Sequence, residues 1–125
     1  MPSSRETALY FDPTGGAQAA PLKTILVCLG VRIKNVPPDQ VGQTVGYLLG
    51  RKGFAAREAP EAPALDAPML VLDGLTDKRL EILLREMKRQ GVSVPYKAVV
   101  TETNLGWIFH QLYDELVREH EAMGG

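Results

Sequence analysis

The stretch M-L-V-L-D-G, residues 69–74, decides the fold of this chain. Its first four residues are all apolar, which is typical of a strand in the centre of a sheet that is covered on both faces. Asp73 and Gly74 end this strand, and Thr76 can cap a helix that follows. Apolar residues at the spacing of one helical face indicate that helix: Leu80, Leu83, Leu84 and Met87. A buried strand followed by an amphipathic helix indicates an α/β domain.

Three more strands are predicted around this unit. Thr7–Phe11 is a short apolar and aromatic run closed by a turn, and residues 96–100 form an apolar run after Pro95. Val31–Asn35 alternates apolar with polar residues, which favours a strand with one wet face or an edge strand. The continuous run at 69–72 therefore belongs in the centre of the sheet.

Three more helices are predicted. An apolar stripe between Pro21 and Gly30 predicts the first, because proline suits the start of a helix and glycine its end. A buried strand over residues 25–29 is the alternative there. The second helix begins at Pro37-Pro38, and the last runs from about Asn104 to Glu121 with Leu105, Ile108, Leu112 and Leu116 on its buried side.

The resulting order is βαβαβαβα, which predicts a three-layer α/β fold with a mostly parallel four-stranded sheet. Strand order 2-1-3-4 places the continuously apolar strand centrally and the alternating strand at an edge. Such a sheet resembles the flavodoxin and receiver folds without a fifth strand. A split arrangement with one antiparallel edge is the alternative. Each half of the chain also shows the same faint pattern of strand, helix, strand, helix.

Length and composition indicate a single soluble domain over residues 1–125. The net charge of −1, with both signs interleaved, argues against a nucleic-acid partner. No apolar run reaches the ~18–20 residues that cross a bilayer, so no membrane partner is expected. With one cysteine and no secretory signal, a cytoplasmic location is expected. Residues 1–6 are expected to be disordered, and the Pro/Ala-rich segment 51–68 is expected to be a mobile connection.

The turn T-E-T-N-L-G-W, residues 101–107, is the principal candidate site. It places Thr101, Thr103, Asn104 and the only tryptophan, Trp107, between a strand and a helix. Thr103 or Asn104 can cap that helix. Trp107 is either part of the core or an exposed aromatic anchor for a partner.

The second predicted helix carries Gly42, Gly46 and Gly50 at intervals of four. Each glycine weakens a helix by roughly 1 kcal/mol relative to alanine, so close packing must compensate. The helix either packs tightly on its own sheet or admits a ligand or a second copy of the chain. Gly42, Gln43, Thr44 and Gly46 are therefore included in the candidate ligand or partner surface, and a homodimer is possible.

Three residues at predicted strand ends resemble the phosphoacceptor pocket of response-regulator receivers. That resemblance implies Asp73 as the acceptor, Asp12 as a metal ligand and Thr101 as the switch hydroxyl. The chain departs from the receiver pattern, because Pro13 replaces the second acid and no fifth strand supplies a lysine. These residues define the alternative site, a binder of a phospho-ligand or small molecule.

No complete catalytic or metal-binding set is present. His110 and His120 lie ten residues apart on one helix, and nothing at a suitable spacing completes a metal site with them. Cys28 lies next to an apolar stripe and is expected to be a small core residue. No metal and no cofactor are expected, and the protein is not expected to be an enzyme.

Residues 70–120 resemble a small family of bacterial proteins known only as a domain of unknown function. The motifs that carry the resemblance are Lys97–Thr101 (K-A-V-x-T), Thr103-Asn104-x-x-Trp107 and Glu119-His120, with Gly42–Gly50 upstream. The resemblance implies a bacterial cytosolic protein and no known reaction. The sequence thus favours a non-catalytic interaction or regulatory module with a protein or small-molecule partner.

Overall fold

The computed structural model describes residues 6–14, 16, 19–58 and 62–123. The elements follow in this order: β1 (Thr7–Phe11), α1 (Ala19–Leu29), β2 (Arg32–Asn35), the 3₁₀ turn η1 (Pro38–Gln40), α2 (Val45–Leu49), β3 (Met69–Asp73), α3 (Asp77–Arg89), β4 (Tyr96–Val99), the 3₁₀ turn η2 (Asn104–Gly106) and α4 (Phe109–Ala122). The predicted alternation of strands and helices is confirmed, and the alternative of a strand at residues 25–29 is excluded.

The four strands form one sheet in the predicted order β2-β1-β3-β4. β1 pairs with β2 and β3 pairs with β4 in parallel, so most pairings are parallel as expected. The central pair, β1 with β3, is antiparallel: Thr7 faces Asp73, and Phe11 faces Met69. The antiparallel pairing thus lies in the middle of the sheet and not at an edge. The sheet consists of two parallel βαβ units joined back to back in opposite directions.

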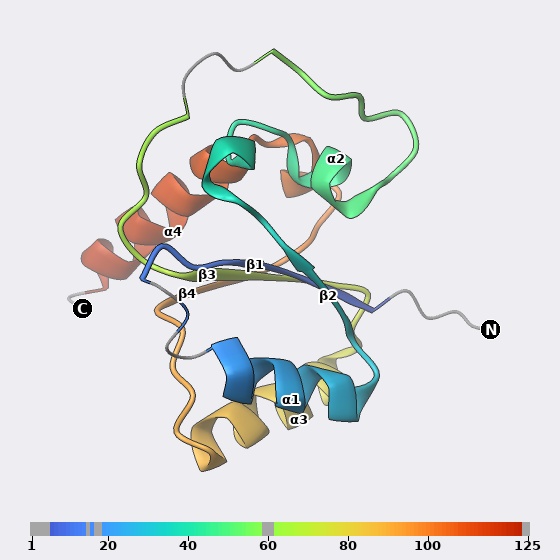
Figure 1. Cartoon of the computed structure of the whole chain (residues 1–125), viewed down its shortest axis with the longest axis vertical. Helices are drawn as coiled ribbons and strands as arrows, with labels where there is room; N and C mark the ends of the chain where they lie inside the picture. The colour runs from blue at the N-terminus through green and yellow to red at the C-terminus, as the bar shows by residue number, and fades with distance from the viewer. Residues whose placement is uncertain (1–5, 15, 17–18, 59–61, 124–125) are drawn as a thin grey trace.

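The helices cover the two faces of the sheet in pairs, which confirms the three layers. Figure 1 shows α1 and α3 on one face and α2 and α4 on the other. β1 and β3 lie between both layers, so all ten of their residues are buried. Alternate residues of these strands enter opposite cores: Ala8, Tyr10, Leu70 and Leu72 face α1 and α3, and Leu9, Phe11, Met69 and Val71 face α2 and α4. Burial on both faces explains why β3 is continuously apolar.

The two halves of the chain repeat the same local structure. α1 ends at Gly30 with a positive φ of 78°, and the N–H of Val31 donates to the carbonyl of Leu26 at 2.9 Å. α3 ends in the same way, with Gly91 at φ 71° and Val92 donating to Met87 at 2.8 Å. Both ends match the Schellman motif, which needs a residue in the left-handed conformation. The repetition predicted from the sequence is therefore present in the structure.

Two predicted helices are interrupted near their starts. The helix predicted from Pro37 to Gly50 is divided into η1 and α2, because Thr44 adopts an extended conformation and its hydroxyl caps α2 by accepting from Tyr47 N at 3.1 Å. The glycines therefore do not lie on one helix: Gly42 precedes α2, and Gly50 ends it at φ 79°. The last helix begins at Phe109 and not at Asn104, since Trp107 and Ile108 are extended.

The connection between α2 and β3 has no regular secondary structure in its described residues, 51–58 and 62–68. Leu65 is buried, and the N–H of Ala67 donates to the hydroxyl of Tyr113 at 3.1 Å. The segment passes over the α2 and α4 side of the sheet (Figure 1). These contacts attach the connection to the α2 and α4 face of the sheet. The mobility of the segment stays a prediction.

Two further expectations concern the N-terminus and the cysteine. The expected disorder of residues 1–6 falls largely outside the described residues, but Glu6 is ordered against Arg79, whose Nε donates to it at 2.8 Å. The expectation that Cys28 belongs to the core is wrong, because its side chain is exposed. Cys28 follows Val27, itself 69% exposed, on the side of α1 that faces away from the sheet.

Among the described residues, no helix is long and apolar enough to cross a membrane.

Candidate functional site

The two predicted acidic residues lie at opposite ends of the sheet. Because β1 and β3 are antiparallel, Asp73 is opposite Thr7, and Asp12 follows the far end of β1. Five residues of extended strand separate these levels by about 17 Å. The prediction of one acidic pocket from Asp12, Asp73 and Thr101 is therefore wrong. It assumed that all strands end at the same edge of the sheet, as in a receiver.

Asp12 acts as a turn residue at the end of β1. It accepts hydrogen bonds from the Tyr10 hydroxyl at 2.8 Å, from Thr14 N at 2.8 Å and from the Thr14 hydroxyl at 2.5 Å. Burial works to raise the pKa of Asp12, but the bonds from Thr14 and Tyr10 outweigh it, and the pKa lies below its usual value. Burial, followed by the bond to this carboxylate, raises the pKa of Tyr10. Asp12 is therefore a well-partnered carboxylate beside a hollow of about 410 Å³ that Asn35, Pro37 and Pro38 also line.

Asp73 is paired with a cation that the sequence did not indicate. Arg51 Nη2 donates to both carboxylate oxygens of Asp73 at 2.7 Å. Asp73 is buried, whereas the Arg51 side chain is 44% exposed. Together with Thr101, Glu102 and Leu105 they line a small hollow of about 190 Å³. Arg51 supplies the positive charge here, so the carboxylate serves an ion pair within the chain.

Thr101 and Asn104 form a reciprocal pair that closes the turn after β4. Thr101 N donates to Asn104 Oδ1 at 2.8 Å, and Asn104 N donates to the Thr101 hydroxyl oxygen at 3.0 Å. Asn104 Nδ2 also donates to the carbonyl of Val99 at 3.0 Å. The prediction that Asn104 or Thr103 caps the last helix is wrong, because Thr103 makes no side-chain cap bond and α4 begins further on. Gln111 Oε1 instead accepts from Ile108 N at 3.1 Å at the start of α4.

The turn at Trp107 lies directly beside the start of α2. Val45 N donates to the Trp107 carbonyl at 2.9 Å, Phe109 N donates to the Gln43 carbonyl at 2.9 Å, and Thr44 forms an isolated antiparallel bridge with Ile108. The structure therefore brings the two predicted parts of the surface together. Thr44 directly precedes α2 and Ile108 directly precedes α4, so the contact joins the starts of the second helix of each half of the chain.

The glycine segment faces inward and not toward a partner. Gly42, Gln43 and Gly46 are all buried. Gln43 exchanges two hydrogen bonds with the backbone of Arg57, at 2.9 and 2.8 Å, and Arg57 Nη1 donates to the Gly42 carbonyl at 2.9 Å. A Cβ at Gly46 would lie 2.6 Å from the Phe54 ring. These residues hold the connection after α2 and are not available as a recognition surface, although a homodimer elsewhere stays a prediction.

The Trp107 side chain combines both roles that the sequence left open. It is partly buried and packs against the core between the sheet and α4. It also lines a hollow of about 290 Å³ with Gln111, Asp114, Glu115 and Arg118, here called the Trp107 hollow. The four α4 residues were missed from the sequence, although their spacing of three and four residues places them on one helical face.

The histidines and the cysteine form no metal site in the described part of the chain, where no group of three or more potential ligands comes together. The His120 ring lies against the ring of Tyr96, 5.7 Å between centroids, in an edge-on arrangement. His110 lies at the start of α4, where its N–H donates to the carbonyl of Val41 at 3.1 Å.

The second half of the chain has a recognised relationship. Residues 68–123 match the family described as Domain of unknown function (DUF3783). The match covers under half of the chain, from the start of β3 through α4, and so includes the Thr101–Trp107 turn and the Trp107 hollow. The resemblance predicted from the sequence is confirmed for this part. No curated protein and no solved structure matched the chain.

Proposed function

We propose that the protein is a non-catalytic interaction module that recognises a basic segment of a partner protein through the Trp107 hollow. The observation that carries the proposal is a partly buried aromatic side chain in a polar-rimmed hollow. Large aromatic residues in such surroundings dominate the binding energy of protein interfaces. A bacterial origin and a cytoplasmic location stay predictions.

The predicted polar groups do not support a catalytic role. Asp12 and Asp73 are far apart, and each is bonded to groups of the same chain. Thr101 and Asn104 bond to each other. A nucleophile needs a base within hydrogen-bonding reach, and none of these residues offers such a pair to a substrate.

Trp107 is held in place from two directions, which suits an anchor. The backbone carbonyl of Trp107 accepts from Val45 N at 2.9 Å, and the backbone N–H of Trp107 donates to the Asn104 carbonyl at 3.0 Å. Both neighbours belong to ordered elements of the α2 and α4 layer. Binding to a rigid surface loses less conformational entropy than binding to a flexible one, so this fixation favours affinity.

Charge on the rim points to a cationic partner group. Glu115 pairs with Arg118 at 2.8 Å, whereas Asp114 is exposed and has no ion pair among the described residues. A lysine or arginine side chain of a partner can lie on the indole face and reach the Asp114 carboxylate at the same time.

Titration with hexa-arginine amide, followed by the fluorescence of the single tryptophan, tests the proposal. We expect a saturable change in emission that weakens with salt. Asp114→Asn removes the charge at the rim without touching the core, and it should weaken binding about fivefold. Glu119→Gln is the matched control, since it removes the same charge from the same helix outside the hollow, and it should bind nearly as wild type does. Equal weakening by both variants would show a diffuse charge effect and overturn the proposal.

A further inference from the structure

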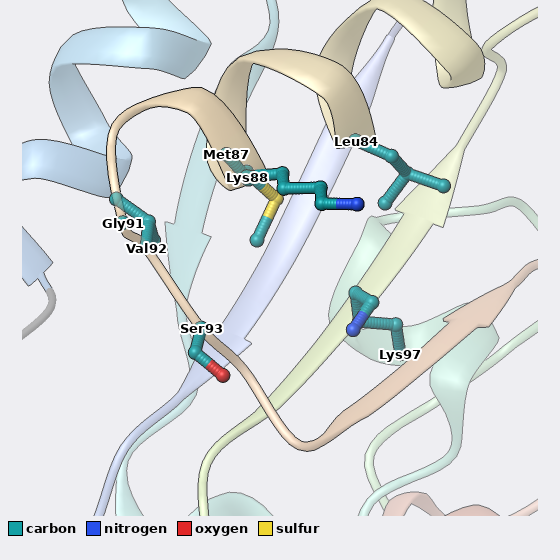
Figure 2. A pocket seen from close by; sticks show the side chains of 7 residues that line it. All are labelled: Leu84, Met87, Lys88, Gly91, Val92, Ser93 and Lys97. Carbon is teal, nitrogen blue, oxygen red and sulfur yellow. The ribbon is translucent and has the colours of Figure 1, made fainter.

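Another hollow lies on the side of the sheet opposite the Trp107 hollow, between the end of α3 and the start of β4. Figure 2 shows the residues that line it: Leu84, Met87, Lys88, Gly91, Val92, Ser93 and Lys97. Its volume is about 440 Å³. This lies within the usual range for sites that hold small molecules, about 300–1,000 Å³.

One part of the lining is apolar. Met87 and Val92 belong to the buried core beneath the hollow, and Leu84 is 38% exposed beside it. Val99 of β4, 42% exposed, extends the apolar surface along the edge of the sheet. The hollow can therefore cover the apolar body of a ligand.

Both charged side chains that line the hollow in the described part of the chain are lysines. Lys88 reaches the hollow from α3, next to the Met87 side chain, and Lys97 reaches it from β4, whereas Ser93 lies on the connection between these two elements (Figure 2). Lys97 Nζ donates to the Val94 carbonyl at 2.8 Å, which holds its ammonium group in place. None of the described residues that line the hollow is acidic.

Glu81 and Glu86 of α3 do not compensate these two charges. Glu86 pairs with Arg89 at 2.8 Å, and Glu81 lies 3.9 Å from Arg85. Among the described residues, neither Lys88 nor Lys97 has an ion pair. Two ammonium groups at one hollow repel each other, and an anion bound between them would remove that repulsion.

We propose that this hollow binds a small organic oxyanion, with a carboxylate or phosphate head at Lys88 and Lys97 and an apolar body on Leu84, Met87 and Val92. A lysine on an edge strand also discourages pairing with another chain. That role accounts for Lys97 alone, because Lys88 lies on a helix. The proposal is independent of the Trp107 hollow, which lies on the opposite face of the sheet.

Titration of the isotope-labelled protein with octanoate, followed by the backbone amide resonances, tests this proposal. We expect saturable shifts confined to the hollow, at Gly91, Ser93 and Lys97, that weaken with salt. Acetate should bind at least about fivefold more weakly, since it lacks most of the apolar body, and 1-octanol should not shift these amides. Octyl phosphate and inorganic phosphate, titrated in parallel, distinguish a phosphate from a carboxylate head. If neither octanoate nor octyl phosphate shifts these amides, or if shifts are spread over the whole surface, the proposal is overturned.

Variants of Lys88 and Lys97 distinguish a role in ligand binding from a purely structural role. Lys88→Gln should weaken octanoate binding about fivefold without changing the melting temperature, because the Lys88 side chain has no ion pair among the described residues and only its backbone carbonyl accepts a hydrogen bond, from Gly91 N at 3.2 Å. Lys97→Arg keeps the charge and should bind nearly as wild type, whereas Lys97→Gln should not. Lys78→Gln, at an exposed lysine in the first turn of the same helix, is the control. Unchanged octanoate affinity in Lys88→Gln would refute the assignment even if the amides shift.

Discussion

Replacing Gly46 with alanine tests whether this glycine of α2 serves internal packing. A Cβ built at Gly46 would lie 2.6 to 2.8 Å from three carbons of the Phe54 ring, closer than real contacts allow. The ring must therefore move. Overpacking of this kind costs about 1–3 kcal/mol. Alanine in place of glycine within a helix contributes about 1 kcal/mol in the opposite direction. The net effect of Gly46→Ala should be a loss of roughly 0–2 kcal/mol in the free energy of unfolding.

A double-mutant cycle isolates the contact from the helix propensity. In a Phe54→Ala background the clash is absent, so adding Gly46→Ala should raise the free energy of unfolding by about 1 kcal/mol. The coupling between the two sites is then about 1–3 kcal/mol, measured by urea denaturation followed by circular dichroism. Gly106→Ala is the control, because no atom of the described residues lies within 4 Å of a Cβ there and its φ is not positive. A stabilising Gly46→Ala in the wild-type background, with no coupling to Phe54, would refute the packing explanation.

Three further predictions follow from ion pairs and exposure. Asp73→Asn should lower the free energy of unfolding by about 1–2 kcal/mol, because the buried Asp73 carboxylate binds a guanidinium that is itself partly solvated. Urea denaturation measures this difference. If the variant is as stable as the wild type, the ion pair with Arg51 contributes nothing to stability. The hydrogen bond from Arg79 lowers the pKa of Glu6, so its contribution is present above the usual pKa of a glutamate and is lost as the pH falls through the lowered value. The stability difference between wild type and Glu6→Gln should therefore shrink between pH 7 and pH 3 in thermal melts, and a pH-independent difference would contradict this. The exposed thiol of Cys28 should react with Ellman's reagent in the folded protein nearly as fast as it does in urea. If the thiol reacts only after unfolding, it is buried in the folded protein, and this prediction is wrong.

The candidate site was only partly predictable because its contacts join distant parts of the chain. The sequence correctly singled out Thr101, Asn104 and Trp107 as one turn, since they are close neighbours. The ion pair of Asp73 with Arg51 spans 22 residues, and the hydrogen bonds of Gln43 with Arg57 span 14. Arg51 and Arg57 both belong to the irregular connection after α2, which has no periodic pattern from which a contact could be predicted.

The sequence alone determined the order of the elements, the strand order and the burial of the central strand. Apolar spacing distinguishes a helical face from a strand, and a continuous apolar run indicates burial on both faces. Glycine and proline marked the helix ends for a local reason, namely the backbone angles that these residues allow or forbid.

Only the tertiary structure decided the direction of β3 relative to β1, and with it the separation of Asp12 from Asp73. A strand buried on both faces is apolar whichever way it runs, so its pattern does not encode its direction. The connection from Gly50 to Pro68 is long enough to deliver β3 from either end of the sheet. The packing of that connection over α2 and α4, through contacts such as Phe54 on Gly46, accompanies the antiparallel arrangement and was not visible in any local pattern.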